Sequence, residues 1–168
     1  MSRPCVISGP DRSNQEFGSF REIFEKESRH MNIYIKKKDF DAIVAYAKTN
    51  LPEEACGLIA GRTRGDERYI EKVYFLENTD HTNEHFTISP KAQIGAVKDM
   101  RAEGLSPLGN WHSHPETPSR PSAEDIRLAM DPKASYLILS LMNMDAPVLN
   151  GFSVKDGAAI KENLVIEE

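Results

Sequence analysis

The spacing of His112 and His114 constrains the local fold more than any other feature of the sequence. The two histidines stand one residue apart at the end of a segment, residues 108–114, that is expected to form a β-strand. Side chains of a strand alternate between its two faces, so residues two positions apart share a face. Both imidazoles are therefore expected to lie side by side on one face of a strand.

A loop and the start of a helix follow this strand. Three prolines stiffen residues 115–121, and Ser122 is expected to cap the new helix. Asp125 then falls in the first helical turn, eleven positions after His114, from where its carboxylate can fold back toward the two imidazoles. Two imidazole nitrogens and one carboxylate oxygen leave a fourth position on a zinc ion open for water, as in catalytic zinc sites. Taken alone, Ser122 and Asp125 also fit an ordinary capping arrangement.

The composition of the chain bounds its class. Its 168 residues, 39% hydrophobic and 28% charged, suffice for one domain with a real core and are too few for two. No run of eighteen apolar residues and no secretory signal is found, so no membrane span is expected. The net charge of −5 argues against non-specific nucleic-acid binding, which requires clustered basic side chains. Cys5 and Cys56 form no disulfide framework, so a reducing, cytoplasmic location is expected.

The first 30 residues differ from the rest of the chain. Turn-forming and helix-breaking residues dominate their first half, whereas a domain-like pattern starts at Met31. We expect residues 1–30 to form an N-terminal tail and residues 31–168 to form one domain. Three interpretations of the tail stay open: a short amphipathic helix over residues 15–29, a mobile segment, and a stretch that is not natively translated because synthesis starts at Met31.

Residues 31–168 alternate between strand and helix patterns. Strands are expected over 33–35, 55–61, 68–76, 85–88, 108–114, 135–142, 148–154 and 160–166, and helices over 38–49, 89–104 and 122–131. Ile94, Val97 and Met100 are expected to form the buried face of the second helix. Cys56 and Trp111 are expected to pack in the interior. This order predicts a single α/β (α+β) sandwich, in which a mixed sheet carries flanking helices.

Hydrolysis at a zinc ion also requires a base that takes the proton from the attacking water. Glu53 and Glu54 precede the apolar segment 55–61, and a carboxylate at the mouth of a buried strand can reach such a water without binding the metal. The spacing does not choose between them. A competing H-x-x-E-H motif at residues 81–85 is expected to be a surface loop, because the zincin chemistry of that motif needs a helix.

Three segments together resemble the JAMM (MPN+) family of zinc metalloproteases. They are residues 52–58 (PEEACGL), 112–115 (HSHP) and 121–125 (PSAED), and the resemblance covers residues 31–168. It implies a cytidine-deaminase-like fold. It also implies one Zn²⁺ per chain, with His112, His114 and Asp125 as its ligands.

The same resemblance implies roles for two further residues. Glu54 matches the catalytic glutamate of the family, which acts as a base on the attacking water and then as an acid toward the leaving amine. Ser122 matches the serine that helps to stabilise the oxyanion, a role that fits a preorganised donor. The neighbouring carboxylates Glu53 and Glu124 are expected to face elsewhere.

The implied activity is that of a zinc-dependent peptidase or isopeptidase that hydrolyses the bond after a C-terminal glycine tail. Small stand-alone prokaryotic members suggest a ubiquitin-like or sulfur-carrier protein with a Gly-Gly end as the substrate. Its tail is expected to bind in extended form next to a sheet edge. Two alternatives stay open: a non-catalytic MPN-type interaction module and a small-molecule amidohydrolase. Neither a nucleic acid nor a membrane is an expected partner.

Overall fold

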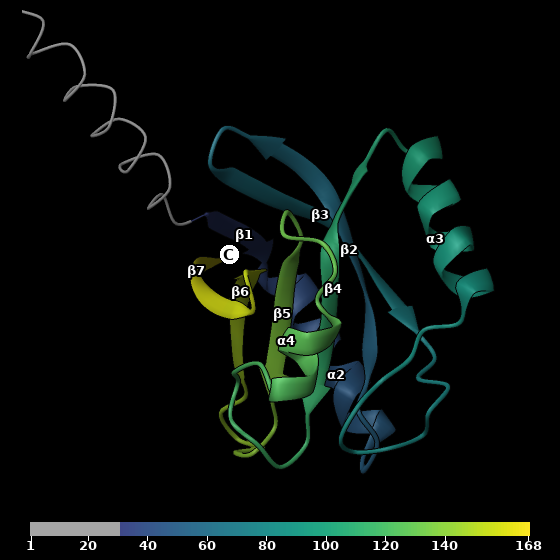
Figure 1. Ribbon diagram of the computed structural model, residues 1–168, viewed down its shortest axis with the longest axis vertical. Helices are drawn as coiled ribbons and strands as arrows, with labels where there is room; N and C mark the ends of the chain where they lie inside the picture. The colour runs from purple at the N-terminus through teal and green to yellow at the C-terminus, as the bar shows by residue number, and fades with distance from the viewer. Residues whose placement is uncertain (1–30) are drawn as a thin grey trace, which may run out of the picture.

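The computed structural model describes residues 31–168, so the interpretations of residues 1–30 lie outside the described residues (Figure 1). This part of the chain forms the following elements: β1 (Asn32–Lys36), α2 (Lys37–Asn50), β2 (Cys56–Arg64), β3 (Glu67–Leu76), α3 (Pro90–Ala102), β4 (Ser106–His114), α4 (Ala123–Leu128), β5 (Ser135–Ser140), β6 (Val148–Lys155) and β7 (Ala158–Glu167). None of the helices in residues 31–168 has the length and hydropathy needed to cross a membrane.

The strands form one mixed sheet that closes into a barrel in the order β1-β3-β2-β4-β5-β6-β7. Strand β1 closes it by pairing in parallel with both β3 and β7. Strands β4 and β5 are also parallel, and the remaining neighbours are antiparallel. The expected mixed sheet with helices is confirmed, but the expected sandwich is not: because β1 hydrogen-bonds both ends of the sheet, the sheet curls around its own core.

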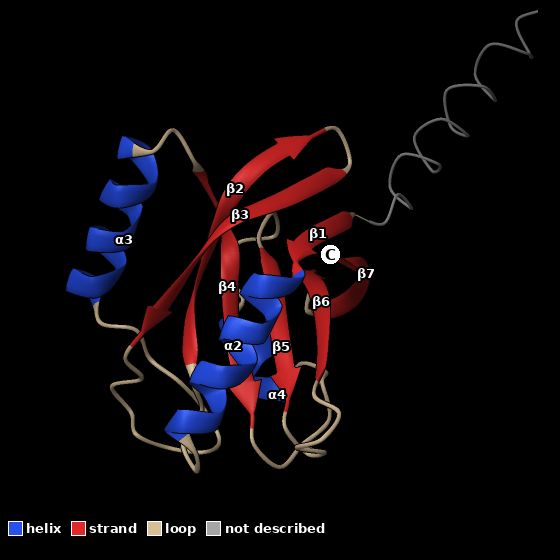
Figure 2. Cartoon of the chain, turned by 180° about the vertical axis from the view of Figure 1, so that it is seen from behind, coloured by secondary structure: helices blue, strands red, loops and turns tan. Residues whose placement is uncertain are grey.

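Helices α2 and α4 lie on opposite sides of β4 and β5 (Figures 1 and 2). On the α2 side, Ile43 packs in the main core with Trp111 of β4 and Leu137 of β5. The alternation along β4 therefore sends Trp111 toward this core and turns its neighbours in the strand toward α4. The face of β4 that carries His112 is thus free to form a site.

Helix α3 begins as expected, since the Oγ atom of Ser89 accepts a hydrogen bond from the amide of Ala92 at 3.2 Å. The prediction for its buried face is confirmed at Met100 and, with partial burial, at Val97, and it is wrong at Ile94, which is 55% exposed. Ala96 packs in the same second core cluster. The helix lies beside one flank of the sheet, so only a narrow stripe is covered.

The segment between β3 and α3, residues 77–89, is a loop, so the strand expected at 85–88 is absent from the described chain. The side chain of Asn78 holds it: Nδ2 donates to the carbonyls of Glu54 and His85 at 3.1 Å each, and Oδ1 accepts from the amide of Thr87 at 3.2 Å. Side-chain hydrogen bonds here take the place of strand pairing.

Helix α4 is shorter than expected. It ends at Leu128, and Ala129 already has extended backbone angles of φ −71° and ψ 95°. Residues 131–134 form a turn in which the amide of Ala134 donates to the carbonyl of Asp131 at 3.1 Å. The turn contains a proline, which disfavours helical geometry in the residue before it.

The interior positions expected for Trp111 and Cys56 are confirmed, since both side chains are fully buried. The indole Nε1 of Trp111 donates to the carbonyl of Tyr74 at 3.0 Å. To reach β3, the indole passes over Gly57 of the intervening strand β2, where a Cβ atom would lie 1.8 Å from the Tyr74 oxygen and 2.5 Å from Nε1. Residue 57 must therefore be a glycine, because the Tyr74 carbonyl and the Trp111 indole come too close to it for a side chain to fit.

Substitution Gly57→Ala is expected to lower the free energy of unfolding by at least about 2 kcal/mol, because the backbone of β3 must move. The matched change Gly95→Ala in α3 meets no atom within 4 Å. It is expected to raise the free energy by roughly 0.5–1 kcal/mol through helix propensity. Urea unfolding of both variants checks this, and equal effects of the two substitutions would contradict the assigned packing.

Candidate metal centre

Strand β4 places His112 and His114 on the same face, as expected from their spacing. Both side chains are buried, and their Nε2 atoms lie 3.0 Å apart. The strand is paired with β2 on one side and with β5 on the other along this stretch. The two rings are therefore held by a backbone that has little freedom to move.

Asp125 reaches the histidines through the cap of α4. The Oγ atom and the backbone amide of Ser122 both donate to Asp125 Oδ2 at 2.7 Å, and the amide of Asp125 donates back to Ser122 Oγ at 3.0 Å. These bonds form a complete capping box. The carboxylate oxygens then lie 3.4 Å from Nε2 of His112 and 3.6 Å from Nε2 of His114. The same hydrogen bonds therefore cap helix α4 and hold the Asp125 carboxylate next to the two histidines.

The three donor atoms fit a metal ion. One atom from each of His112, His114 and Asp125 lies within 4.8 Å of the others, and this is the metal-type cluster found in residues 31–168. The separations, 3.0 Å between the two Nε2 atoms, 3.4 Å from His112 to Oδ1 and 3.6 Å from His114 to Oδ2 of Asp125, are close to the roughly 3.4 Å between donors on a tetrahedral ion with bonds of about 2.1 Å. Nitrogen and oxygen donors in this number suit a zinc ion with one open position.

Each histidine ring is oriented by a group outside the cluster. Nδ1 of His114 lies 3.1 Å from the carbonyl oxygen of Pro118, to which it can donate, leaving the Nε2 lone pair for a metal. The ring of Phe86 stacks on His112, with centroids 4.8 Å apart and planes inclined by 28°. No sequence pattern indicated Phe86, because a single aromatic residue in a polar loop gives no periodicity.

Glu54 lies two residues before the start of β2 and is only 4% exposed. Its amide donates to the carbonyl of Thr82 at 2.8 Å, and its own carbonyl accepts from Asn78. Its Oε1 atom lies 3.9 Å from Nε2 of His114, near the cluster but outside it. Burial raises the pKa of Glu54 to about 7, with His114 opposing and Asp125 adding to the rise. The position suits a proton acceptor better than a ligand.

The charges of the cluster are coupled. Burial lowers the pKa of His112, only partly offset by Asp125. Burial also acts to lower the pKa of His114, but Asp125 and Glu54 raise it more strongly, and its pKa ends above the usual value. Burial acts to raise the pKa of Asp125, while hydrogen bonds with both histidines outweigh it and hold that pKa well below the usual range. The carboxylate is thus available as an ionised donor.

Neither neighbouring carboxylate belongs to the donor cluster, although Glu124 lines the cavity beside it. Glu53 points out to His81, with Oε2 3.1 Å from Nδ1, and Glu124 binds Arg127 at 2.7 Å. The histidines of the H-x-x-E-H motif are in the loop 77–89, and His85 lies 3.8 Å from Asp80. Of the two glutamates, Glu54 therefore lies beside the cluster and Glu53 does not. The H-x-x-E-H motif is not helical, as expected.

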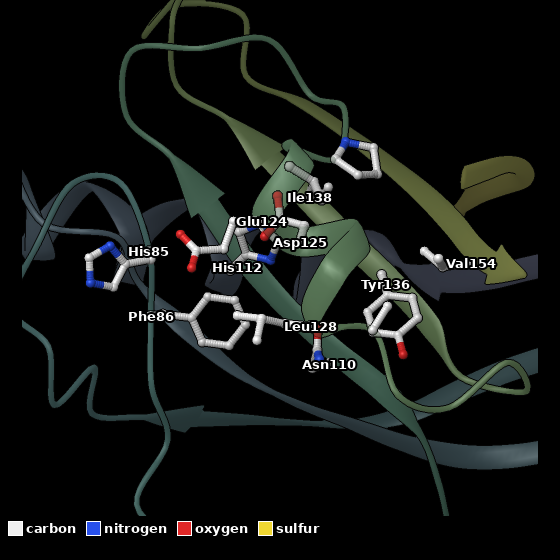
Figure 3. Close-up of a pocket in the computed structure, with 12 residues that line it drawn as sticks. His85, Phe86, Asn110, His112, Glu124, Asp125, Leu128, Tyr136, Ile138 and Val154 are labelled. Carbon is white, nitrogen blue, oxygen red and sulfur yellow. Dashed lines mark ion pairs between the residues drawn. The ribbon is translucent and has the colours of Figure 1, made fainter. Parts of the chain in front are cut away.

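A cavity of about 190 Å³ adjoins the centre (Figure 3). His112 and Asp125 border it at one end, and the loop residues His85 and Phe86 face helix α4 across it. Its remaining lining residues are Asn110, Pro121, Glu124, Leu128, Ala129, Tyr136, Ile138 and Val154. The cavity is smaller than the roughly 300–1,000 Å³ of typical small-molecule sites.

Known sequences match this chain over most of its described part. A family model for prokaryotic homologs of the JAB domain matches residues 36–152. The CysO-cysteine peptidase of Mycobacterium tuberculosis is 29% identical over 130 residues, which are 76% of this chain and 86% of the peptidase. A probable TtuB-protein conjugate cleaving protease of Thermus thermophilus is 34% identical over 98 residues, or 58% of this chain and 63% of that protease.

Solved structures agree with the fold. The solution structure of a protein from Desulfitobacterium hafniense has a TM-score of 0.76 and 48% identity, covering 82% of this chain and 94% of its own. The crystal structure of a JAB1/MPN domain protein from Archaeoglobus fulgidus has a TM-score of 0.50 and 21% identity, covering 82% of this chain and all of its own. At that identity the second likeness supports the fold alone.

The burial of Glu54 predicts a pH-dependent stability once metal is removed with a chelator. Because the folded pKa is about 7 and the usual value of a glutamate 4.5, the folded state binds more protons between these pH values, and stability falls as pH rises through them. In Glu54→Gln this loss is absent. The free energy of unfolding of the variant is therefore expected to rise relative to the native chain by up to about 3 kcal/mol from pH 4.5 to pH 7.5.

Urea unfolding in chelator at these two pH values measures the difference. Glu53→Gln serves as the matched control for the loss of one carboxylate at the same end of β2. If the free energies of unfolding of Glu54→Gln and the native chain differ by the same amount at both pH values, the burial of Glu54 is contradicted.

Proposed function

Because the chain belongs to the family of prokaryotic JAB-domain homologues, we propose that it is a zinc-dependent peptidase or isopeptidase that hydrolyses the bond after a C-terminal glycine tail. The observation that supports this most is the convergence of three donors with one buried carboxylate outside the donor set. His112, His114 and Asp125 offer one ligand atom each, and Glu54 lies 3.9 Å from His114. One Zn²⁺ per chain is part of the proposal.

When bound, zinc would supply a Lewis acid for the scissile carbonyl and lower the pKa of the attacking water. Glu54 would take the proton from that water and pass it to the leaving amine. Its burial keeps water from competing for the carboxylate, and its main-chain bonds to Thr82 and Asn78 fix the position of the residue. Burial raises the pKa of Glu54 in the metal-free site, and the charge of a bound zinc ion would oppose that rise and favour the ionised form that accepts a proton.

Ser122 has two candidate roles. Its hydroxyl donates to Asp125 and accepts from the Asp125 amide, which supports a role in holding the carboxylate. Stabilisation of the oxyanion, the role implied by the family resemblance, needs the hydroxyl to turn from Asp125 toward the substrate. The backbone amide of Ser122 would then still hold Asp125 Oδ2. Both roles are therefore compatible within one catalytic cycle.

The substrate class proposed is a ubiquitin-like or sulfur-carrier protein with a Gly-Gly end. The names of the relatives support it, since one is a CysO-cysteine peptidase, another is named for cleaving TtuB-protein conjugates, and a third is a desampylase of Haloferax volcanii. A glycine tail also fits the small cavity beside His112 and Asp125. The cytoplasmic location expected from the cysteines belongs to the same proposal.

The alternatives are less well supported. A non-catalytic interaction module has no need for three converging donors with a buried carboxylate next to them. A small-molecule amidohydrolase is expected to have a larger enclosed pocket than the 190 Å³ found beside the centre. Zinc content and the size of the cleaved substrate distinguish all three functions.

The decisive variant is Glu54→Gln, which keeps the volume of the side chain and removes its basicity. We expect it to bind about one zinc per chain, as the native protein does, and to cleave at least about 100-fold more slowly. The substrate is a carrier protein extended past its Gly-Gly end, with cleavage read by mass spectrometry. A chelator is expected to stop the native enzyme, and added zinc to restore it.

Glu53→Gln is the matched control, since its carboxylate binds His81 on the outside and is expected to be dispensable for cleavage. Full activity of Glu54→Gln, or failure of the native chain to bind zinc offered in excess at neutral pH, would overturn the proposed function.

A further inference from the structure

Strand β4 cannot offer its main chain to a substrate at the centre. Its residues from Gly109 to His112 pair with β2 on one side, and its residues from Gly109 to His114 pair with β5 on the other. The sheet edge expected beside the site is therefore absent along this part of β4. A peptide that reaches the centre must lie across the side chains of the strand, and its own N–H and C=O groups need other partners.

Asn110 is placed to be such a partner. It precedes His112 by two residues on β4, so its side chain shares the face of the ligands, about 6.6 Å along the strand. It borders the cavity beside the centre (Figure 3). Its Oδ1 atom is buried and accepts no hydrogen bond from residues 31–168. Buried amide oxygens in proteins are nearly always paired, so this unpaired oxygen lacks a partner that a turn of the Asn110 side chain toward the cavity would let a substrate supply.

The cavity lies on the acyl side of the scissile bond. Its wall includes His112 and Asp125. Glu54 lies next to His114, 3.9 Å from its Nε2, and does not line this cavity. In the proposed reaction Glu54 protonates the leaving amine, so the amine must lie on the Glu54 side. The segment that carries the scissile carbonyl then extends through the cavity.

The cavity is also continuous with a second groove on the Asn110 side of the centre. Asn110, Leu128 and Tyr136 border it and also border a second, wider groove of about 570 Å³ between α3 and the turn after α4. Phe86 and Ile138 add apolar walls near the centre. An extended chain can therefore pass from the centre over Asn110 to the groove, whose lining includes Gln93, Asp131 and Lys133 beside apolar residues.

We propose that Asn110 is a substrate-positioning residue whose Oδ1 accepts a hydrogen bond from the main-chain N–H of the penultimate residue of the tail. This rests on the proposed function. The spacing supports it: in an extended chain, that N–H lies about two strand residues' length from the scissile carbonyl, as Asn110 lies from His112. A residue that accepts a hydrogen bond from a main-chain N–H can align a glycine tail, which has no side chains for the enzyme to bind.

The test uses peptides that end in the Gly-Gly tail followed by a reporter amine. In one peptide the amide that joins the penultimate residue to the residue before it is replaced by an ester, which removes this N–H and little else. Native enzyme and Asn110→Leu are compared on both peptides by kcat/KM, with mass spectrometry to confirm which bond is cleaved. Asn110→Leu keeps the approximate volume and removes the acceptor.

For the native enzyme we expect the ester to lower kcat/KM about tenfold, and Asn110→Leu to lower it about tenfold on the all-amide peptide. The two losses are expected not to add, so that Asn110→Leu cleaves both peptides at nearly the same rate. Native kinetics of Asn110→Leu, or losses that multiply to about 100-fold, would overturn the role of Asn110.

Zinc content and melting temperature identify an Asn110→Leu protein that is misfolded, and loss of either would mean that Asn110 is structural, which also overturns the proposal. Asn163→Leu, which changes an exposed amide bonded to Asn32 on the far side of the barrel, is the matched control. If the native enzyme cleaves no glycine-tailed substrate, the proposed function itself fails. If it cleaves them and Asn110→Leu does so equally well, only the role of Asn110 fails.

Discussion

The centre depends on the pairing of β4 with neighbours on both of its sides. Two ladders of hydrogen bonds, to β2 and to β5, hold this strand, so His112 and His114 cannot separate without breaking sheet structure. Both rings lie on the face of β4 that is turned toward α4, where they are buried with their Nε2 atoms 3.0 Å apart. Holding donors in place before a metal arrives avoids much of the entropic cost of collecting them. The rigid strand also removes main-chain partners for the substrate, which is why a side chain such as Asn110 gains importance.

The third donor is brought to the strand by a different device. The loop between β4 and α4 is tied to β5, since Ser119 Oγ donates to the carbonyl of Ile138 at 2.6 Å and Ser140 Oγ donates to the carbonyl of Thr117 at 2.7 Å. The capping box of α4 then aims the Asp125 carboxylate at the histidines. A helix of only six residues is enough, because it has to position one side chain and packs no buried residue of its own.

Local patterns in the sequence predicted most of this, and long-range packing accounts for what they missed. The alternation around His112 and the cap at Ser122 are local, so the three donors could be predicted, whereas the choice of Glu54 over Glu53 came from the family resemblance. Closure of the barrel by β1 could not be predicted, because pairing between residues far apart leaves no periodic pattern. The exposed position of Ile94 and the loop held by Asn78 depend likewise on contacts between distant segments. The boundary between residues 1–30 and 31–168 stays a prediction.

X-ray absorption spectroscopy of the zinc-loaded native chain tests the central claim most directly, namely that two histidines of β4 and one aspartate of α4 hold a single ion. Only nitrogen and oxygen scatterers are expected, at about 2.0–2.2 Å, with the outer-shell scattering of two imidazoles. A sulfur scatterer at about 2.3 Å would place the ion at a cysteine such as Cys56, and a spectrum without imidazole scattering would place it on surface carboxylates. Either result would contradict the assigned centre.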